Sequence, residues 1–436
     1  MIRKVYYLVI PLLIVGVSIG YTSFAMALIA LLPLSFMTTR HTVAIYLVMY
    51  GGPLGGVIRA MYPTLPIYGL LFVMIGLLLM WDEISDLISH HFGAIGGVFL
   101  TLAVFGFFYL LGPKTEFAVD KFLSMCSNGL LMVFGYYVFD KSNKIDAEGL
   151  SLMLLISSIC MSLYAINAMA LHPGGLFNYD WFREQSVSYS MANNWETDTI
   201  VNYQHIGMLI LFSISVFLSQ KELKALPTFF WIICCMHFAL VSGARQAILG
   251  VLLVIILRFT VYKTSNVKSQ NTPSRHLKVI FWLSIAVVVL IFVLQNLQVG
   301  VVQDTMEEGD QGRMIRYLEA LVIFSDYPIL GSGLGGYEAI SGEEWPHNFI
   351  LELLCETGLI GTLIFISILI IPLIKNKQNY YHLTSSGMFF FLILLGLFVR
   401  VLVSADFRES IELFSAVFAI TATSKSVLMK DVKKSL

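Results

Sequence analysis

Long apolar runs separated by short polar breaks recur along the whole chain. Many of them approach 20 residues, the length that an α-helix needs to cross about 30 Å of hydrocarbon at about 1.5 Å per residue. The pattern therefore predicts an all-α polytopic integral membrane protein with about 12–14 transmembrane helices. We expect a single transmembrane domain over residues 1–436.

The polar breaks also set the bounds of the individual helices. The first two predicted helices are short, and they could form a re-entrant pair instead of two crossings. The predicted helices span residues 5–19, 21–37, 42–58, 65–81, 92–111, 118–139, 149–171, 200–219, 227–242, 245–262, 278–297, 348–374, 384–403 and 408–425.

The composition excludes a soluble globular protein. Hydrophobic residues make up 57% of the chain and charged residues 13%, with a mean hydropathy of +0.80. Soluble domains average about 45–50% apolar and about 25% charged residues. The net charge of −1 argues neither for nor against nucleic acid, and we expect no nucleic-acid partner. The five cysteines all fall within apolar runs, so neither a disulfide framework nor a zinc site is predicted.

The distribution of positive charge predicts the orientation in the membrane. Lysines gather beside the last predicted helix and in alternate loops, which marks those segments as cytoplasmic. Of the 16 lysines, only Lys114 and Lys121 fall in predicted external segments. We therefore predict a multi-pass membrane protein with both termini in the cytoplasm.

Arginine is distributed differently from lysine, because seven of the 11 arginines are predicted to be external. A guanidinium binds phosphate or carboxylate through two parallel hydrogen bonds, so an external surplus of arginine indicates such a ligand. The alternative is that these side chains only extend from helix ends toward the membrane surface. The external arginines are Arg59, Arg183, Arg245, Arg313, Arg316, Arg400 and Arg408.

Two predicted external segments are long enough to have a function of their own: 172–199 and 298–347. The first is rich in Asn, Ser, Tyr and Trp, which suits binding to sugars, although it could also be a merely solvated loop. The second contains a periodic stretch from Arg313 to Phe324, whose apolar residues fall on one helix face. We predict an interfacial amphipathic helix there, with Arg313 and Arg316 together on a different face.

The second segment continues with a glycine-rich run from Gly331 to Gly336. No βαβ unit surrounds the run, so it is not a dinucleotide-binding fingerprint. Glycines such as Gly331 and Gly333 let the backbone turn tightly, and they either approach a ligand closely or form a purely structural turn.

His347 is the strongest candidate for a catalytic residue. It lies at the external mouth of a predicted helix, directly before Asn348, which is a good N-cap residue. An imidazole, with a reference pKa of about 6.5, is suited to take a proton from a hydroxyl near neutral pH. The helix that follows carries Glu352 and Glu356 on one face, four residues apart.

Two further arginines are candidates because of their positions. Arg245 closes a tight external link between two predicted helices, so its charge must lie at a helix mouth. Arg400 lies inside an apolar run, and an intramembrane charge indicates function by default. The structural alternative for Arg400 is an ion pair with Asp406 or Glu409.

These pieces together resemble the shared C-terminal signature of the Wzy-type O-antigen polymerases and the O-antigen ligases. The resemblance covers about residues 240–375, and the N-terminal half resembles the family only in its hydropathy. The residues that carry it are Ser242 to Arg245, Gly312-Arg313, Tyr327 to Gly333, His347-Asn348-Phe349, Leu351-Glu352 and Glu356 to Gly361.

The resemblance implies a glycosyltransferase of the GT-C type in the bacterial inner membrane, which acts on undecaprenyl-diphosphate-linked glycans at the periplasmic face. It implies no cofactor and no metal, with Arg245 and Arg313 holding the donor diphosphate and His347 as the base. We add Arg316 and Arg400 to the diphosphate site only from their placement, and Asn348, Gly331 and Gly333 as supporting residues. Membrane lipid and a chain-length regulator protein are candidate partners.

The residues independently favour the same chemistry, since transfer from a lipid diphosphate needs cations for the leaving group and a base for the acceptor. No Asp-x-Asp pair occurs in a predicted external loop, so arginines would replace a metal clamp. We expect an O-antigen polymerase, because the divergent first half suits adaptation to one repeat unit. A ligase that transfers the glycan to lipid A core is the alternative. A transporter of lipid-linked oligosaccharide fits less well, because the notable residues cluster at one face.

Overall fold

The computed structural model describes the backbone of about half of the chain, and all regular structure within that part is helical. Nothing is stated below about the other residues. The described residues are 2–18, 33, 35–48, 69–90, 92–123, 126, 145–168, 203–220, 223, 225–242, 245–261, 310–343, 345–375, 392, 394 and 396–398.

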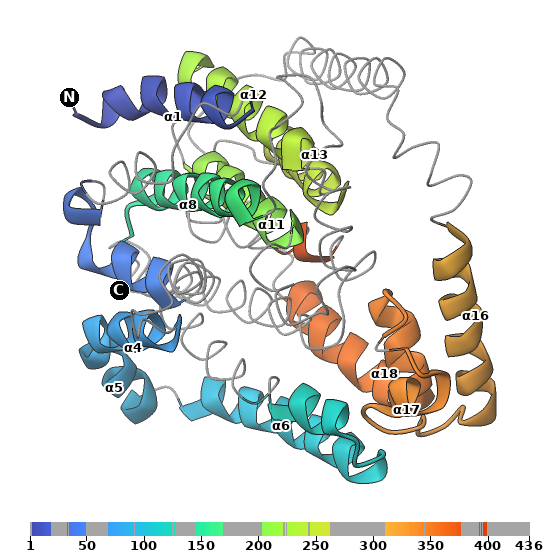
Figure 1. The fold of residues 1–436 in the computed structure, drawn as a ribbon. Coiled ribbons are helices and arrows are strands. Elements are labelled where there is room, and N and C mark those ends of the chain that lie inside the picture. Colours follow the sequence, from blue (N-terminus) through green and yellow to red (C-terminus); the bar gives the residue numbers. More distant parts are fainter. Residues whose placement is uncertain are drawn as a thin grey trace, which may run out of the picture. The chain divides into compact units, whose positions relative to one another are not determined.

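Eleven long or well-defined helices are labelled in Figure 1 among the described residues. Residues 40–48 and 116–123 are helical as well. The labelled helices are α1 (Ile2–Ser18), α4 (Gly69–Leu79), α5 (Trp81–His90), α6 (Phe92–Leu111), α8 (Ala147–Ala168), α11 (Tyr203–Leu218), α12 (Ala225–Ser242), α13 (Arg245–Val261), α16 (Asp310–Asp326), α17 (Gly336–Ser341) and α18 (Phe349–Lys375).

Most of the described helices begin and end within four residues of the bounds predicted from hydropathy. Helix α6 has the predicted bounds, and α12, α13 and α18 each begin and end within two residues of the prediction. Helix α5 was not predicted, because its ten residues form an amphipathic, acidic stretch that resembles a polar break. The predicted helices 278–297 and 408–425 lie outside the described residues, and so do the loop 172–199 and Arg400.

The composition of the helices is consistent with an all-α membrane protein. In the described part of the chain one stretch, Phe349–Ile371, is long and apolar enough to cross a membrane. Shorter apolar helices include Ala147–Leu163 and Ile206–Leu218. The total number of crossings and the GT-C fold stay predictions.

The chain divides into two compact units, and each is described here by itself. The first unit comprises Met1–Met80 and Asn143–Val302, and the second comprises Trp81–Ser142 and Gln303–Leu436. The second unit contains the histidine and the glycine-rich run of the family signature.

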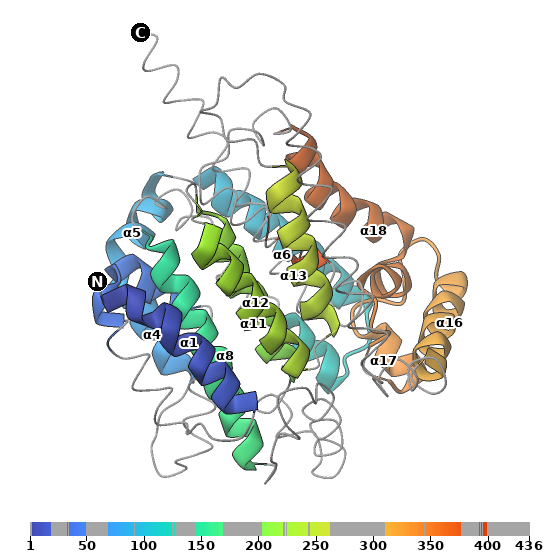
Figure 2. The same cartoon turned by 90° about the horizontal axis from the view of Figure 1, so that it is seen from above.

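In the first unit, α11 packs against α8, α12 and α13, and Figure 2 shows these helices from above. Helices α8 and α11 are joined by a reciprocal pair of hydrogen bonds. The hydroxyl of Ser151 donates to the carbonyl of Ser213 at 2.6 Å, and the hydroxyl of Ser213 donates to the carbonyl of Ser151 at 2.8 Å. Small hydroxyl-bearing residues of this kind let apolar helices approach closely and bond to one another in a membrane.

In the second unit, α16 and α17 pack against α18 around a small core. Ala320 and Ile323 of α16 meet Tyr337 of α17 and Cys355 of α18, and all four side chains are buried. Helix α6 adds a second contact to α18, where the rings of Phe105 and Phe365 stack with centroids 4.4 Å apart. This packing holds the signature segments together.

Candidate functional site

Helix α18 is broken at Gly358, whose backbone has φ 63° and ψ −168°. In an unbroken helix the amides of Leu359 and Ile360 would donate to the carbonyls four residues earlier. Here they donate to the carbonyls of Pro328 and Ile329, at 2.9 and 3.2 Å. The break therefore opens α18 to the loop that follows α16.

The same loop satisfies the carbonyls on the other side of the break. The amide of Ser332 donates to the carbonyl of Cys355 at 2.8 Å, and the amide of Gly333 donates to the carbonyl of Glu356 at 2.8 Å. The hydroxyl of Ser332 adds a second bond to Cys355 at 2.9 Å. Four backbone hydrogen bonds to the loop thus satisfy the amides and carbonyls on both sides of the break.

Glycine is needed on both sides of this contact. Gly331 and Gly333 have φ 71° and 84°, in the left-handed region that favours glycine. A Cβ atom on Gly331 would lie 2.3 Å from the carbonyl carbon of Glu356, and one on Gly358 would lie 2.4 Å from the oxygen of Ile329. The close approach that these glycines permit is therefore to the protein's own backbone, which favours the structural turn over direct ligand contact.

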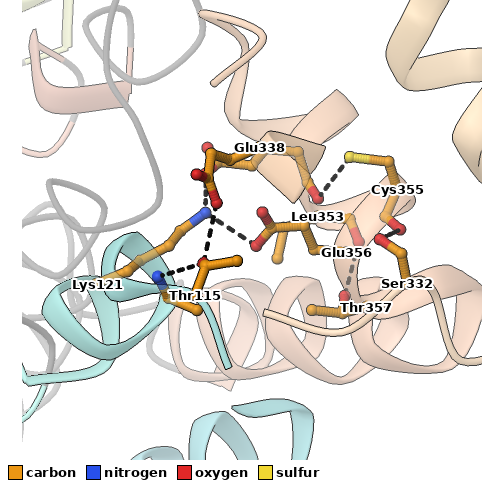
Figure 3. Close-up of polar contacts among 10 residues, drawn as sticks. Thr115, Lys121, Ser332, Glu338, Leu353, Cys355, Glu356 and Thr357 are labelled. Atoms are coloured by element: carbon orange, nitrogen blue, oxygen red, sulfur yellow. Dashed lines mark hydrogen bonds and ion pairs between the residues drawn. The ribbon is translucent and has the colours of Figure 1, made fainter. Parts of the chain in front are cut away.

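A buried ion cluster ties helical residues 116–123 to α18 (Figure 3). The ammonium of Lys121 bonds to Glu352 and, at 2.8 Å, to Glu356. All three side chains have 0% exposure to solvent. Burying charge is costly unless the charges are paired, and removing one partner leaves the others uncompensated. In the sequence, Lys121 is 231 residues from Glu352 and 235 residues from Glu356.

The sequence placed Glu352 and Glu356 on one helix face but did not identify their partner. Carboxylates inside an apolar helix usually have a charged or hydrogen-bonding partner, and a cation is the best one. Lys121 was one of only two lysines predicted outside the cytoplasmic segments, and this isolation was the signal that could have indicated it.

His347 begins the turn that leads into α18. Its backbone φ is 55°. In the described part of the chain, His347 is the sole non-glycine residue with a positive φ. Such a conformation is uncommon outside glycine and persists where the surroundings hold it. Asn348 caps α18, as predicted, because its side-chain oxygen accepts from the amides of Ile350 and Leu351 at 3.0 and 3.2 Å.

Trp345 fixes the ring of His347. The indole N–H of Trp345 donates to Nδ1 of His347 at 2.9 Å, and the two ring centroids are 5.5 Å apart in an edge-on arrangement. An indole N–H can only donate, so Nδ1 carries no hydrogen in this arrangement. The imidazole is therefore neutral with its hydrogen on Nε2, and its lone pair on Nδ1 faces the indole.

A helix, α16, is present where the interfacial helix is predicted. Met314, Leu318, Leu321 and Val322, the four residues predicted to share a face, are between 45% and 59% exposed. The opposite side of the helix packs into the small core of the second unit. The exposed apolar face is the arrangement expected for a helix that contacts lipid.

The predicted diphosphate-binding arginines are described to different extents. The guanidinium of Arg316 pairs with Glu343 at 2.6 Å, where both side chains are partly exposed. Arg313 lies in the first turn of α16, in the second unit, and Arg245 is the first residue of α13, in the first unit. The side chains of Arg245 and Arg313, and all of Arg400, lie outside the described part of the structure. The structure thus places His347, Asn348 and the glycine-rich loop in one compact unit, the first two at the start of α18 and the loop at its break, and the arginine cluster stays a prediction.

Comparison with known families agrees with the resemblance. The family described as O-antigen ligase matches residues 228–366, which contain α13, α16, α17 and the first part of α18. This match supports assignment to the O-antigen polymerase and ligase family. The match is consistent with a membrane enzyme of the ligase or polymerase type and does not separate the two activities. No curated protein matches the chain.

The contact between the glycine-rich loop and the broken helix can be tested with two alanine substitutions. Gly331 and Gly342 both have positive φ, but a Cβ atom on Gly342 would meet nothing within 4 Å. Gly342→Ala therefore introduces only backbone strain, which we expect to cost about 1 kcal/mol. Gly331→Ala should cost at least twice as much, because its methyl group displaces the backbone of α18. The measurement is thermal unfolding of the purified protein in detergent, and equal losses for both variants would contradict the close approach.

The buried cluster predicts an unequal response to loss of its charges. Lys121→Met leaves two buried carboxylates without a cation, and we expect it to destabilise the protein by about 3–5 kcal/mol. Adding Glu352→Gln and Glu356→Gln removes those charges and should recover a large part of the loss. Lys114→Met is the control: this lysine is exposed and its hydrogen bonds to the carbonyls of Tyr109 and Gly112 are solvated, so its loss should cost less than about 1 kcal/mol. Failure of the triple variant to exceed the single one in stability would contradict a charge-based role.

Proposed function

We propose that this protein is an O-antigen polymerase that joins undecaprenyl-diphosphate-linked repeat units at the periplasmic face of the inner membrane. The family match over residues 228–366, which includes His347 and Asn348, supports glycosyl transfer from a lipid-linked donor. The divergent first half of the chain favours the polymerase over the ligase. Residues 298–347 then lie outside the membrane on the periplasmic side, and both termini lie in the cytoplasm. The exposed apolar face of α16 supports a location of this segment at the membrane surface.

The proposed reaction is one direct displacement. A hydroxyl of the acceptor glycan attacks the anomeric carbon of the donor, and the bond from that carbon to the diphosphate oxygen breaks. The electron pair of that bond leaves with the lipid diphosphate, while the proton of the hydroxyl passes to His347. Inversion at the anomeric carbon follows from the single displacement.

Each candidate residue has a separate role in this scheme. Arg245 and Arg313 hold the donor diphosphate and compensate the charge that develops on it as it leaves. Arg316 can join them by exchanging the carboxylate of Glu343 for a phosphate oxygen, since their ion pair is partly exposed. Arg400 is the fourth proposed cation. These guanidiniums take the place of a metal ion, so we expect a metal-independent enzyme.

The fixed position of His347 favours its role as the base. Its backbone is held in a left-handed turn, its neighbour Asn348 caps α18, and the start of α18 is anchored by the buried Lys121 cluster. A base is effective when it is held within hydrogen-bond reach of the proton that it accepts. In this arrangement Nδ1 is the nitrogen able to accept it, because Nε2 carries the hydrogen.

The O-antigen ligase is the second candidate, because the matching family is described by that activity. A ligase would use the same donor and the same chemistry, and it would transfer the glycan to lipid A core in place of another lipid-linked repeat unit. The two candidates therefore differ only in the acceptor.

The products formed in cells lacking the protein separate these candidates. Loss of a polymerase should leave lipopolysaccharide capped with a single repeat unit. Loss of a ligase should leave bare core while lipid-linked polymer accumulates. Gel profiles of lipopolysaccharide from the deletion strain, with and without a plasmid copy, give the answer. Unchanged long chains in the deletion strain would contradict both activities.

The roles of His347 and Arg313 predict a specific pattern of activity in purified enzyme given a lipid-linked substrate. Loss of a general base commonly costs about 10²–10⁴ in rate, so His347→Ala should nearly stop chain growth without loss of donor binding. Arg313→Lys keeps the charge but loses the planar pair of donors, and a diphosphate-binding role requires a marked loss of activity.

Two results would contradict these roles. Full turnover by either variant would refute the role of the residue concerned. Activity that is lost on chelation and restored by a divalent cation would refute metal-independent catalysis by the arginines.

A further inference from the structure

We propose that Trp345 is a positioning residue for His347. Before transfer its indole N–H donates to Nδ1 of His347, and during transfer the acceptor hydroxyl takes its place. This inference rests on the proposed function, because it gives a partner to the proposed base. The observation behind it is the 2.9 Å hydrogen bond from the indole nitrogen to Nδ1. Trp345 thereby protects the lone pair of the base until the acceptor replaces the indole.

The direction of this hydrogen bond is what makes the inference specific. In the neutral imidazole one nitrogen carries the hydrogen and the other accepts. Since the indole can only donate, Nδ1 of His347 must be the accepting nitrogen. An acceptor hydroxyl that is about to lose its proton also donates to the base, so the hydroxyl and the indole N–H compete for one lone pair.

Trp345 is held by contacts that lie outside the matched family segment. Its ring stacks on Phe117, with centroids 6.5 Å apart and planes 14° from parallel. The ammonium of Lys121 lies 5.7 Å from the centroid of the Phe117 ring. The same ammonium is buried in its ion pairs with Glu352 and Glu356. Helical residues 116–123 thus support Trp345, and Trp345 supports His347.

The chemical consequence concerns water. If Nδ1 of His347 were open before the acceptor arrived, a water molecule could donate to it and attack the anomeric carbon. The carbon–oxygen bond to the diphosphate would break as in transfer, and the products would be a free glycan and the lipid diphosphate. An indole N–H on Nδ1 suppresses this hydrolysis, because water must first displace it.

Trp345→Phe tests the inference, since it keeps an aromatic ring for Phe117 and removes the N–H donor together with the five-membered ring that carries it. Purified enzyme is given lipid-linked repeat units, and chain growth and release of free glycan are measured together. A hydrogen bond contributes about 0.5–1.5 kcal/mol net, so with a donor whose acceptor hydroxyl is blocked the release of free glycan should rise about 2- to 10-fold. A merely structural role would lower the release of free glycan as well as chain growth, and that result would overturn the inference.

Two companion variants complete the test. In the double variant with His347→Ala the rise in free glycan should disappear, because no base is left for water to use. Phe117→Leu keeps the indole but loosens it, and should raise the release of free glycan by a smaller factor. If Trp345→Phe does not yield folded protein, unchanged release of free glycan by Phe117→Leu overturns the inference. Full activity of His347→Ala alone would instead refute the proposed base, which is a separate outcome.

Discussion

The exchange of backbone hydrogen bonds at Gly358 is the constraint on which the second unit depends. A break in an apolar helix exposes amides and carbonyls that cost several kcal/mol each when water cannot reach them. The loop after α16 satisfies four of these groups through Pro328, Ile329, Ser332 and Gly333. The broken helix and the glycine-rich loop therefore stabilise each other, and neither is expected to keep its conformation alone.

The candidate site follows from this exchange. Once the loop is fixed on α18, α17 lies against α16 and α18, with Tyr337 in the shared core. The hydroxyl of Thr115 bonds to Glu338 of α17 at 2.9 Å, which joins the start of helical residues 116–123 to the same assembly. Lys121 then anchors that helix to α18, and Phe117 reaches Trp345. The orientation of His347 is thus set by backbone contacts as much as by side chains.

Hydropathy predicted the helices well but could not predict how α18 is broken. The bounds of α6 and α18 follow from the lengths of apolar runs, and the cap at Asn348 follows from local chemistry. Gly358 lies within an apolar run that reads as one continuous helix, because hydropathy does not report which carbonyl an amide bonds to. The Lys121 cluster was missed for another reason. Lys121 is more than 200 residues from both glutamates, and no local pattern joins it to them.

The surplus of external arginine over lysine has a structural counterpart. Both lysines predicted to be external are engaged within the protein. Lys121 is buried between two carboxylates, and Lys114 donates to carbonyls of Tyr109 and Gly112 at the end of α6. An ammonium that compensates buried carboxylates cannot leave them for a phosphate without leaving two charges uncompensated. Compensation of a leaving diphosphate would then fall to guanidiniums, whose planar pairs of donors match phosphate oxygens. In this scheme the two cation types therefore have different roles. The two lysines predicted to be external stabilise the protein, and the proposed external arginines bind the substrate.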